Sequence, residues 1–148
     1  MNNERGHETV EHTADMGLTG WGRFENEAFE EVALAMFELI VDGEGIEPRK
    51  NIPISAEGKD EKELLVDFLN TLLTVADIEE LVFLDVDVRM IWGDNATHEF
   101  FLDAVAHGVP IGEVRERLLQ EVKAVTYYGV SLGRDQSGNT RATVVVDL

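Results

Sequence analysis

Hydrophobic residues recur along the chain at two spacings, and each spacing predicts one kind of secondary structure. A spacing of three or four residues predicts two amphipathic helices, for which Asn26 and Asp60 are the expected N-caps. Acids at positions 27–31 suit the positive end of the first helix dipole. Glu63, three residues after Asp60, completes a capping box for the second helix. The predicted apolar stripes are Phe29, Val32, Met36 and Ile40 in the first helix, and Leu65, Phe68, Leu72 and Val75 in the second.

A spacing of two residues predicts strands separated by short turns. In the clearest case, apolar residues at 82, 84, 86, 88 and 90 alternate with Phe83, Asp85, Asp87 and Arg89. The Gly-Asp-Asn stretch at 93–95 predicts a hairpin that returns through residues 100–104. Further strands are expected at 8–12, 17–22, 52–56, 122–132 and 141–148, with a helical turn at 113–120. Together these elements predict an α+β fold, a single domain over residues 1–148 with about seven strands in mainly antiparallel sheets.

The composition narrows the possible functions. The chain has 148 residues, with 30 acids against 12 lysines and arginines, a formal charge of −18, and no cysteine. Such acidity disfavours independent binding to nucleic acid or to anionic lipid, and the lack of cysteine excludes disulfides and thiolate chemistry. Because we find neither a signal peptide nor a long apolar run, we expect a cytoplasmic protein with no membrane association. Adaptation to a salty cytoplasm and a surface shaped for a basic partner or a cation would both explain the charge.

Familiar catalytic motifs are missing. The sequence contains no G-x-S-x-G elbow, no Walker loop and no H-E-x-x-H, and the glycines at 17–22 do not have nucleotide-binding spacing. We expect His7, His98 and His107 to stand alone at strand edges or turns as surface or packing residues. Serine hydrolase, nucleotide kinase and zinc protease are therefore poor assignments.

Polar residues gather at two places far apart in the sequence. The segment at 11–17 carries His12 and Asp15 at a strand end, and Asp147 follows the apolar run at 144–146. Asp15 could simply bond the backbone of a turn, and Asp147 could simply emerge into solvent. If the last strand lies beside the first, however, the two carboxylates meet. Hard oxygen ligands of this kind suit Ca²⁺ or Mg²⁺.

Two other positions have a functional and a purely structural interpretation. Lys123 lies in a predicted strand, where it either has a function or protects an edge from pairing. Asp85 and Asp87 share one face of their strand, which would suit acid–base catalysis, but the alternation around them assigns that face to solvent.

Several of these segments resemble one known family, the archeases. The resemblance is carried by EHTADMGLTGWG at 11–22, AFEEVALAMFELI at 28–40, KELLVDFLNTLL at 62–73, VKAVTYYGV at 122–130 and the final VVVDL. These segments occur in the family's order and spacing from Glu11 to Leu148, and the combination of HTAD, VKAVTY and a closing Asp-Leu is specific.

The resemblance implies an α+β fold with one metal site and a role as a protein cofactor rather than a catalyst. By position, Asp15 and Asp147 correspond to the metal ligands, Leu148 adds a main-chain or terminal oxygen, and the metal is usually assigned as calcium. Lys123 corresponds to the lysine needed to activate the partner, and we group His12 with it as a residue of the loop that shapes the site.

The partner implied by the resemblance is the RNA ligase that joins tRNA exons. Archeases speed the transfer of GMP from GTP to the ligase's active-site histidine and support multiple turnover, while the ligase carries the nucleotide and manganese chemistry. An acidic cofactor could approach a basic RNA-binding enzyme without competing for RNA.

The sequence departs from the family pattern at two places, and two other classes of function are compatible with its composition. Tyr128 stands where histidine is frequent, and Gly108-Val109 stands where Gly-Glu is frequent, which removes a carboxylate that could have supported the metal site. A general chaperone or interaction module would not depend on Asp15. A metal-dependent hydrolase would turn over a substrate alone, but the sequence offers no convincing general base beside the two acids.

Overall fold

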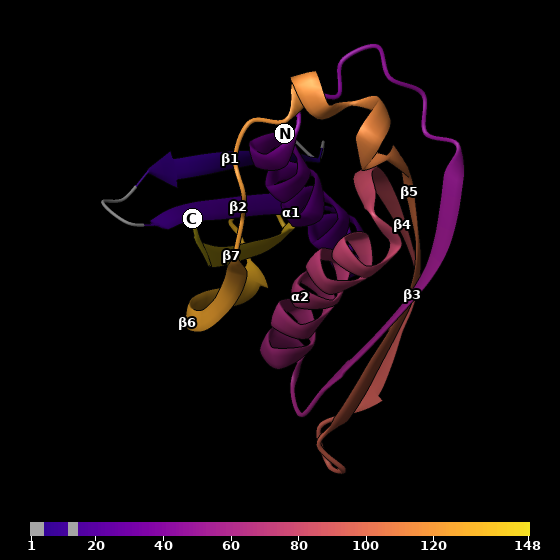
Figure 1. The fold of residues 1–148 in the computed structure, drawn as a ribbon. Coiled ribbons are helices and arrows are strands. Elements are labelled where there is room, and N and C mark those ends of the chain that lie inside the picture. The colour runs from indigo at the N-terminus through magenta and orange to yellow at the C-terminus, as the bar shows by residue number, and fades with distance from the viewer. Residues whose placement is uncertain (1–4, 12–14) are drawn as a thin grey trace.

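Two antiparallel sheets enclose a pair of helices (Figure 1). The computed structural model describes residues 5–11 and 15–148. In the first sheet the strand order is β1-β2-β7-β6, and in the second it is β3-β5-β4. The four-stranded sheet contains β1 (Gly6–Glu11), β2 (Asp15–Gly22), β6 (Ala124–Arg134) and β7 (Thr140–Asp147). The three-stranded sheet contains β3 (Lys50–Gly58), β4 (Leu81–Asp94) and β5 (Glu99–Pro110). The predicted α+β fold with about seven strands and two helices is therefore confirmed for the described residues.

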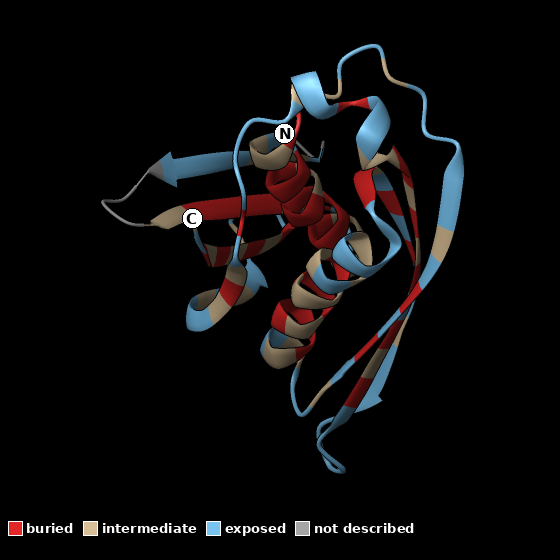
Figure 2. Ribbon diagram, in the orientation of Figure 1, coloured by how far each residue is buried: buried red, intermediate tan, exposed pale blue. Residues whose placement is uncertain are grey.

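The core lies between the sheets, around helices α1 (Glu25–Ile40) and α2 (Glu61–Glu79). Helix α1 packs against β2 and β4, and α2 packs against β3 and β6, so each helix touches both sheets. Figure 2 shows α1 buried along most of its length, and Phe29 of this helix stacks on Phe68 of α2 with ring centroids 6.2 Å apart. In the part of the chain that the structure describes, no helix has the length and apolar character needed to cross a bilayer.

The predicted helix stripes are confirmed, with Ile40 and Val75 half-buried at their ends and the other six residues buried. The capping box of α2 is also confirmed. Asp60 Oδ1 accepts the Glu63 N–H at 2.8 Å, and Glu63 Oε1 accepts the N–H of Lys59 at 3.0 Å. One orphan N–H of the helix start is thus satisfied by the Asp60 side chain, and the reciprocal bond from Glu63 reaches the residue before the cap.

The predicted N-cap of α1 is wrong. The helix begins one residue before Asn26, with Phe24 as N-cap and no side-chain bond from that cap. Instead, Glu27 Oε1 accepts the N–H of Arg23 at 2.9 Å, which performs part of the capping role from inside the first turn. The sequence pattern could not show this, because Asn26 and Glu27 are both suitable capping residues and only the entry path of the chain decides between them.

The acids at 27–31 also do more than complement the helix dipole. Glu30 and Glu31 are buried, and both pair with the guanidinium of Arg5, Glu30 at 3.0 Å. Burial raises the pKa of Glu30. The hydrogen bonds from the Val88 N–H and from Arg5 lower it and so offset part of this rise. Since Val88 N–H donates to Glu30 Oε2 at 2.7 Å, this acid fastens α1 to β4 as well as to the N-terminal segment. Buried carboxylates need such partners, since an unpaired one would be costly.

The strands differ from the predicted pattern where β-bulges interrupt them. The register of β4 against β5 shifts between Phe83 and Asp85 and again between Val88 and Met90. As a result Phe83 is buried and Met90 is 56% exposed, opposite to the predicted alternation. Each bulge adds one residue and so reverses the faces of the residues beyond it.

Three smaller predictions also change. The β4–β5 turn lies at residues 95–98, beyond the expected 93–95. The expected helical turn at 113–120 consists of two short 3₁₀ turns, Ile111–Glu113 and Arg115–Arg117. The predicted strand at 122–132 is confirmed as β6 with both ends two residues later, and its register against β7 shifts between Thr126 and Ser131.

The first residues of the two helices, Glu25 and Glu61, form a carboxyl–carboxylate pair. Burial raises the pKa of Glu25 to about 8, and the hydrogen bond and negative charge of Glu61 contribute to the rise. The folded protein therefore keeps a proton on Glu25 that the unfolded chain loses near its ordinary value of 4.5. Because the folded state binds more protons in this range, stability falls as the pH rises from about 4.5 to about 8.

The substitution Glu25→Gln should relieve this loss, because an amide keeps the hydrogen bond without ionising. Solvent screens the pair on its open side, so we expect a gain of about 1 kcal/mol in unfolding free energy at pH 8 and almost none at pH 4.5. Urea unfolding at both pH values measures it. Glu47→Gln, which removes an exposed acid, is the control for net charge; an equal gain from that variant would contradict the assignment to the pair.

Candidate functional site

Asp15 and Asp147 lie directly opposite each other where β2 pairs with β7. Asp15 is the first residue of β2 and Asp147 is the last of β7, so both carboxylates project from the same end and the same face of the sheet. Directly opposed side chains in an antiparallel pair have Cβ atoms roughly 5 Å apart, and like charges at that separation destabilise the sheet. The predicted meeting of these two acids is therefore confirmed, and it creates a local excess of negative charge.

Lys123 joins this end of the sheet through its backbone. Its N–H donates to the main-chain oxygen of Asp147 at 2.9 Å, and the next residue, Ala124, is paired with Asp147 in the β6–β7 register. The side chain of Lys123 is exposed, and its ammonium forms no ion pair with any residue in 5–11 or 15–148. An exposed, unpaired lysine beside an acid pair can contact a second molecule without breaking an internal interaction.

Asn70 holds this strand in place, and the sequence pattern did not single it out. Its side-chain amide bonds both backbone groups of Val125: Nδ2 donates to the Val125 oxygen and Oδ1 accepts the Val125 N–H, each at 2.9 Å. Because β6 is an edge strand, these backbone groups have no neighbouring strand, and the amide of Asn70 replaces one. A signal was available, since Asn70 interrupts the apolar residues at 68, 69, 72 and 73, but its partner could be found only from the fold.

The register shift of β6 leaves residues 127–130 unpaired next to Val145 of β7. Gly129 has φ +84°, which permits the chain to turn here, and a Cβ on it would approach the Val145 side chain to 3.1 Å. Val145 lies two residues from Asp147 on the same face of β7. Tyr128 in this segment is 87% exposed, so a large aromatic side chain projects from β6 into solvent.

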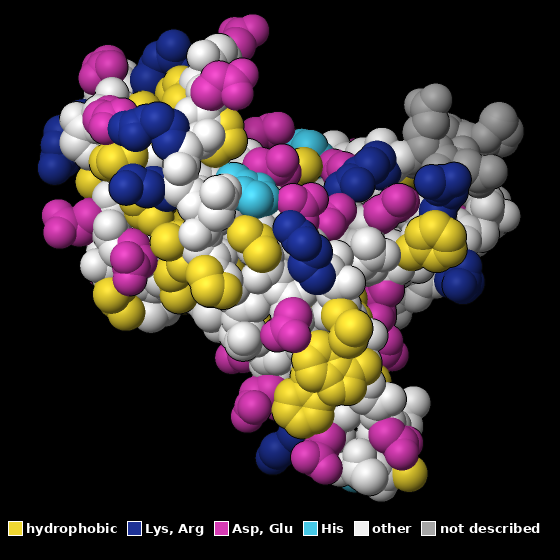
Figure 3. Space-filling model, turned by 90° about the vertical axis from the view of Figure 1, so that its right-hand side faces the viewer, with side chains coloured by type: hydrophobic (Ala, Val, Ile, Leu, Met, Phe, Trp, Pro, Cys, Tyr) yellow, Lys and Arg dark blue, Asp and Glu magenta, His cyan; other side chains and the backbone are white. Residues whose placement is uncertain are grey.

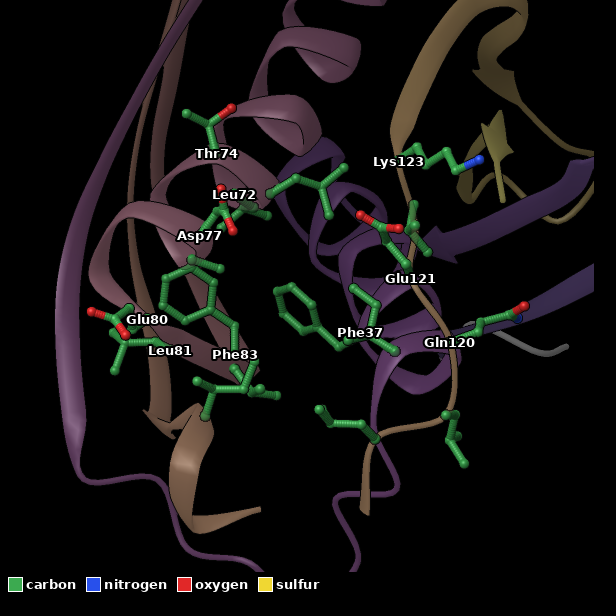
Figure 4. A pocket seen from close by; sticks show the side chains of 18 of the residues that line it. Phe37, Leu72, Thr74, Asp77, Glu80, Leu81, Phe83, Gln120, Glu121 and Lys123 are labelled. Atoms are coloured by element: carbon green, nitrogen blue, oxygen red, sulfur yellow. The ribbon is translucent and has the colours of Figure 1, made fainter. Parts of the chain in front are cut away.

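A groove of about 750 Å³ lies on the other side of the segment that carries Lys123 (Figure 4). Its walls come from the second half of α2, the start of β4 and residues 118–123, and the side chains of Phe37, Leu72 and Phe83 line it. In Figure 4 the Lys123 ammonium points away from Phe37 and Phe83. The groove is mainly apolar and includes neither Asp15 nor Asp147, so we do not place the metal or charge-dependent chemistry there.

The structure places all the other candidate residues except one. His12 lies outside the described residues, so its assignment stays a prediction. Asp85 and Asp87 are exposed, as predicted. Val109, which stands where the family often has glutamate, is buried in the other sheet among Val82 and Val114. A glutamate at this position would therefore not have reached the acid pair.

The expectation that the histidines stand alone is wrong for two of the three. His7 Nδ1 and Nε2 lie 2.6 and 3.0 Å from carboxylate oxygens of Glu31 and Glu38. His107 lies between Asn51 and Asp87, at 2.6 and 2.8 Å. Both are strand residues whose partners come from elements distant in sequence, so sequence spacing alone could not identify them. His98 is an exposed turn residue with φ +56°.

The donors at the acid pair fit a hard divalent cation. Asp15 and Asp147 would supply carboxylate oxygens, and the partly buried Leu148, which follows Asp147, would supply a main-chain oxygen. Among residues 5–11 and 15–148 no group of three or more His, Asp or Glu side chains gathers in a way that could hold a metal. Since Ca²⁺ takes 6–8 oxygen ligands, water or a bound partner would complete its coordination. Oxygen donors of this kind favour calcium or magnesium over zinc.

The arrangement defines a class of protein: a two-sheet α+β fold with paired carboxylates at one end of the four-stranded sheet. The Archease protein family model matches residues 7–148. Archease of Pyrococcus furiosus is 40% identical over 141 residues, which cover 95% of this chain and 97% of the relative. Archease of Pyrococcus abyssi is 36% identical over the same length and coverage.

A solved structure shares the fold. The solution structure of protein 1598 from Methanobacterium thermoautotrophicum superimposes with a TM-score of 0.76 at 31% identity, covering 97% of this chain and 99% of that one. With a family model spanning nearly the whole chain and relatives of this similarity, the chain belongs to the archease family.

The role of Asn70 predicts the effect of two substitutions. Asn70→Leu leaves the Val125 N–H and oxygen without partners and should lower the unfolding free energy by about 1–3 kcal/mol. Asn70→Asp keeps the acceptor for the N–H and should cost less. Thr74→Ala, an exposed position on the same helix, is the control. Urea unfolding measures the change, and hydrogen exchange at Lys123 and Val125 shows whether the loss is local. Unchanged exchange at these two amides would contradict the role of Asn70.

Proposed function

We propose that this protein activates the RNA ligase that joins tRNA exons, by promoting transfer of GMP from GTP to the ligase and thereby multiple turnover. Membership of the archease family supports the proposal, because the family resemblance implies this partner. The observation that carries it is the meeting of Asp15, Asp147 and Lys123 at one end of the four-stranded sheet. These are the three residues that correspond to the family's metal ligands and activating lysine.

The protein acts in this proposal as a cofactor and not as a catalyst. The acid pair holds a divalent cation, for which calcium is our assignment, through Asp15, Asp147 and a Leu148 oxygen. The cation would neutralise the opposed carboxylates, and its open coordination positions face outward, where the ligase would approach. We keep His12 as a predicted contributor to the loop beside the site. The ligase supplies the nucleotide and the RNA contacts, in the cytoplasm that both proteins share.

Lys123 provides the second element of the proposed contact. Its ammonium is exposed and free of internal ion pairs among the described residues, while its backbone is fixed by Asp147 and, two residues further, by Asn70. A mobile side chain on a fixed backbone can reach a carboxylate or phosphate of the partner at little conformational cost. The charge of −18 supports attraction to a basic RNA-binding enzyme and disfavours competition for its RNA.

A ligase guanylylation assay tests the proposal. We expect Asp15→Ala, Asp147→Ala and Lys123→Ala each to reduce stimulation of the ligase by about tenfold or more, the result of losing roughly 1.4 kcal/mol of interaction. Lys59→Ala and Glu116→Gln, at exposed positions away from the site, should stimulate normally. Normal stimulation by all three site variants would defeat the proposal. Suppression of aggregation in unrelated proteins, without dependence on Asp15, would favour a general chaperone instead.

Metal binding has a separate readout that needs no ligase. Since the two carboxylates repel each other without a cation, Asp147→Asn should raise the Tm in the presence of a chelator. Calcium should stabilise the unaltered protein through mass action but leave Asp147→Asn almost unaffected, so the order of stability reverses when calcium is added. Thermal unfolding with and without calcium measures this. Equal calcium shifts for Asp147→Asn, Glu116→Gln and the unaltered protein would remove the metal from the proposal.

A further inference from the structure

The outer face of the three-stranded sheet carries an exposed aromatic cluster that the proposed function does not use. Trp92 on β4 and Phe101 on β5 are paired across the strands and stack with ring centroids 5.5 Å apart. Trp92 is 42% exposed, and neighbouring Met90 is exposed as well. We call Met90, Trp92 and Phe101 the aromatic patch. Large apolar side chains that stay together in solvent commonly mark a binding surface.

Acidic residues occupy the same face in register with the patch. The cross-strand rows on this face are Glu57-Phe101-Trp92, Ser55-Asp103-Met90, Pro53-Val105-Asp87 and Asn51-His107-Asp85. None of these residues is buried, four of them are acids, and none is lysine or arginine. Figure 3 views this side of the molecule and shows hydrophobic side chains gathered on its lower part with Asp and Glu around them.

Exposed aromatic rings flanked by carboxylates restrict which class of molecule can bind this face. Nucleic acid and anionic membranes would stack or insert on such aromatics, but four acids on the face and a chain charge of −18 repel them. A second copy of this chain would bring the same acids together, which is also unfavourable. An arginine side chain satisfies both parts of the surface, because its guanidinium stacks on an aromatic ring while it donates hydrogen bonds to a carboxylate.

The acids beside the patch differ in whether their carboxylates already have hydrogen-bond partners. The side chain of Glu57 has no partner among the described residues, while Asp103 accepts a long hydrogen bond from Ser55 at 3.4 Å. Asp87 is bonded to His107 at 2.8 Å. Glu57, in the same row as Trp92 and Phe101, is therefore the carboxylate most available to an incoming guanidinium. Arg89, the bulge residue of β4, adds one positive charge next to these rows.

We propose that the aromatic patch, together with Glu57 and Asp103, is a docking surface for a positively charged, arginine-containing protein segment. The segment lies across β5, with an arginine stacked on the Trp92–Phe101 pair and bonded to Glu57. The surface belongs to the three-stranded sheet, whereas the acid pair belongs to the other sheet, so this binding does not depend on the proposed metal site or on ligase activation.

The direct test is binding of a short fluorescein-labelled peptide of alternating arginine and serine, followed by fluorescence anisotropy at low salt. We expect Trp92→Ala to weaken binding by about threefold to fivefold without any change of charge, as loss of an exposed cation–π contact implies. Phe101→Ala should act similarly. Tyr128→Ala, which removes an exposed aromatic from the other sheet, is the matched control and should bind normally.

Charge variants and peptide variants separate specific docking from general attraction. Glu57→Gln should weaken binding more than Glu116→Gln, although each removes one negative charge. A lysine peptide of the same charge should bind more weakly than the arginine peptide, because an ammonium stacks less well. In a ¹⁵N spectrum the indole N–H signal lost in Trp92→Ala should be the one that shifts on peptide addition, which shows docking even where a variant is unstable.

Four results would overturn the proposal. These are equal affinities of the unaltered protein, Trp92→Ala and Tyr128→Ala; no binding of the arginine peptide; Trp92-dependent binding of oligouridine; and concentration-dependent dimerisation that Trp92→Ala abolishes. The first would reduce the effect to non-specific attraction by an acidic chain, and the last two would assign the patch to RNA or to a second copy. Ligase stimulation by Trp92→Ala is measured separately, so failure here leaves the proposed function untouched, and the reverse also holds.

Discussion

The pairing of β2 with β7 is the interaction on which the site depends. It sets residues 15 and 147, separated by almost the whole sequence, opposite each other in one ladder. The pairing is fixed from inside, because Val144 and Val146 face the core with no exposed surface and a shift of one residue would turn them to solvent. The opposed aspartates are thus a cost that core packing imposes, and a bound cation would offset it. The burial of the valines on one face and the chemistry of the acids on the other are two consequences of a single register.

Further contacts hold the neighbouring strand against this ladder. Lys123 is tied by its N–H to Asp147, and Val125 is held by both ends of the Asn70 amide. Helix α2, itself packed between the sheets, therefore sets the position of the segment that presents Lys123. Damage to the core below α2 would reach the site through this amide, without any change in the acids themselves. The aromatic patch on the opposite sheet shares no residue with this arrangement and is independent of it.

Much of this could be predicted from the sequence, because the signals are local. The stripes from Phe29 to Ile40 and from Leu65 to Val75, and the capping box of Asp60, depend on residues a few positions apart. Asp15 and Asp147 could be brought together by assuming that the last strand lies beside the first. The structure instead pairs the last strand with the second, β2, which begins at Asp15, so the two acids still meet. Asn26 is the better capping residue in isolation, but the path of the chain from β2 starts the helix earlier.

The missed features all depend on contacts between distant segments. Asn70 looks like an ordinary polar interruption of an apolar stripe until the unpaired backbone of β6 lies beside it. Met90 and Phe83 follow the predicted alternation only if β4 is regular, and the two bulges that reverse their faces have no proline or glycine to announce them. His7 and His107 look isolated in the sequence because their carboxylate and amide partners come from other elements. Hydrophobic periodicity therefore gives wrong predictions mainly for side chains whose role depends on tertiary contacts.

The most direct measurement of the central claim is the location of a bound ion. A paramagnetic lanthanide that replaces calcium broadens the NMR signals of nearby amides, so titration of ¹⁵N-labelled protein maps the site without the ligase. If a cation sits between Asp15 and Asp147, the amides of Asp15, Met16, Lys123, Ala124 and Asp147 should broaden first, and Asp147→Asn should abolish the effect. Broadening centred on another acidic pair, such as Glu25 and Glu61, or spread evenly over the surface, would contradict it.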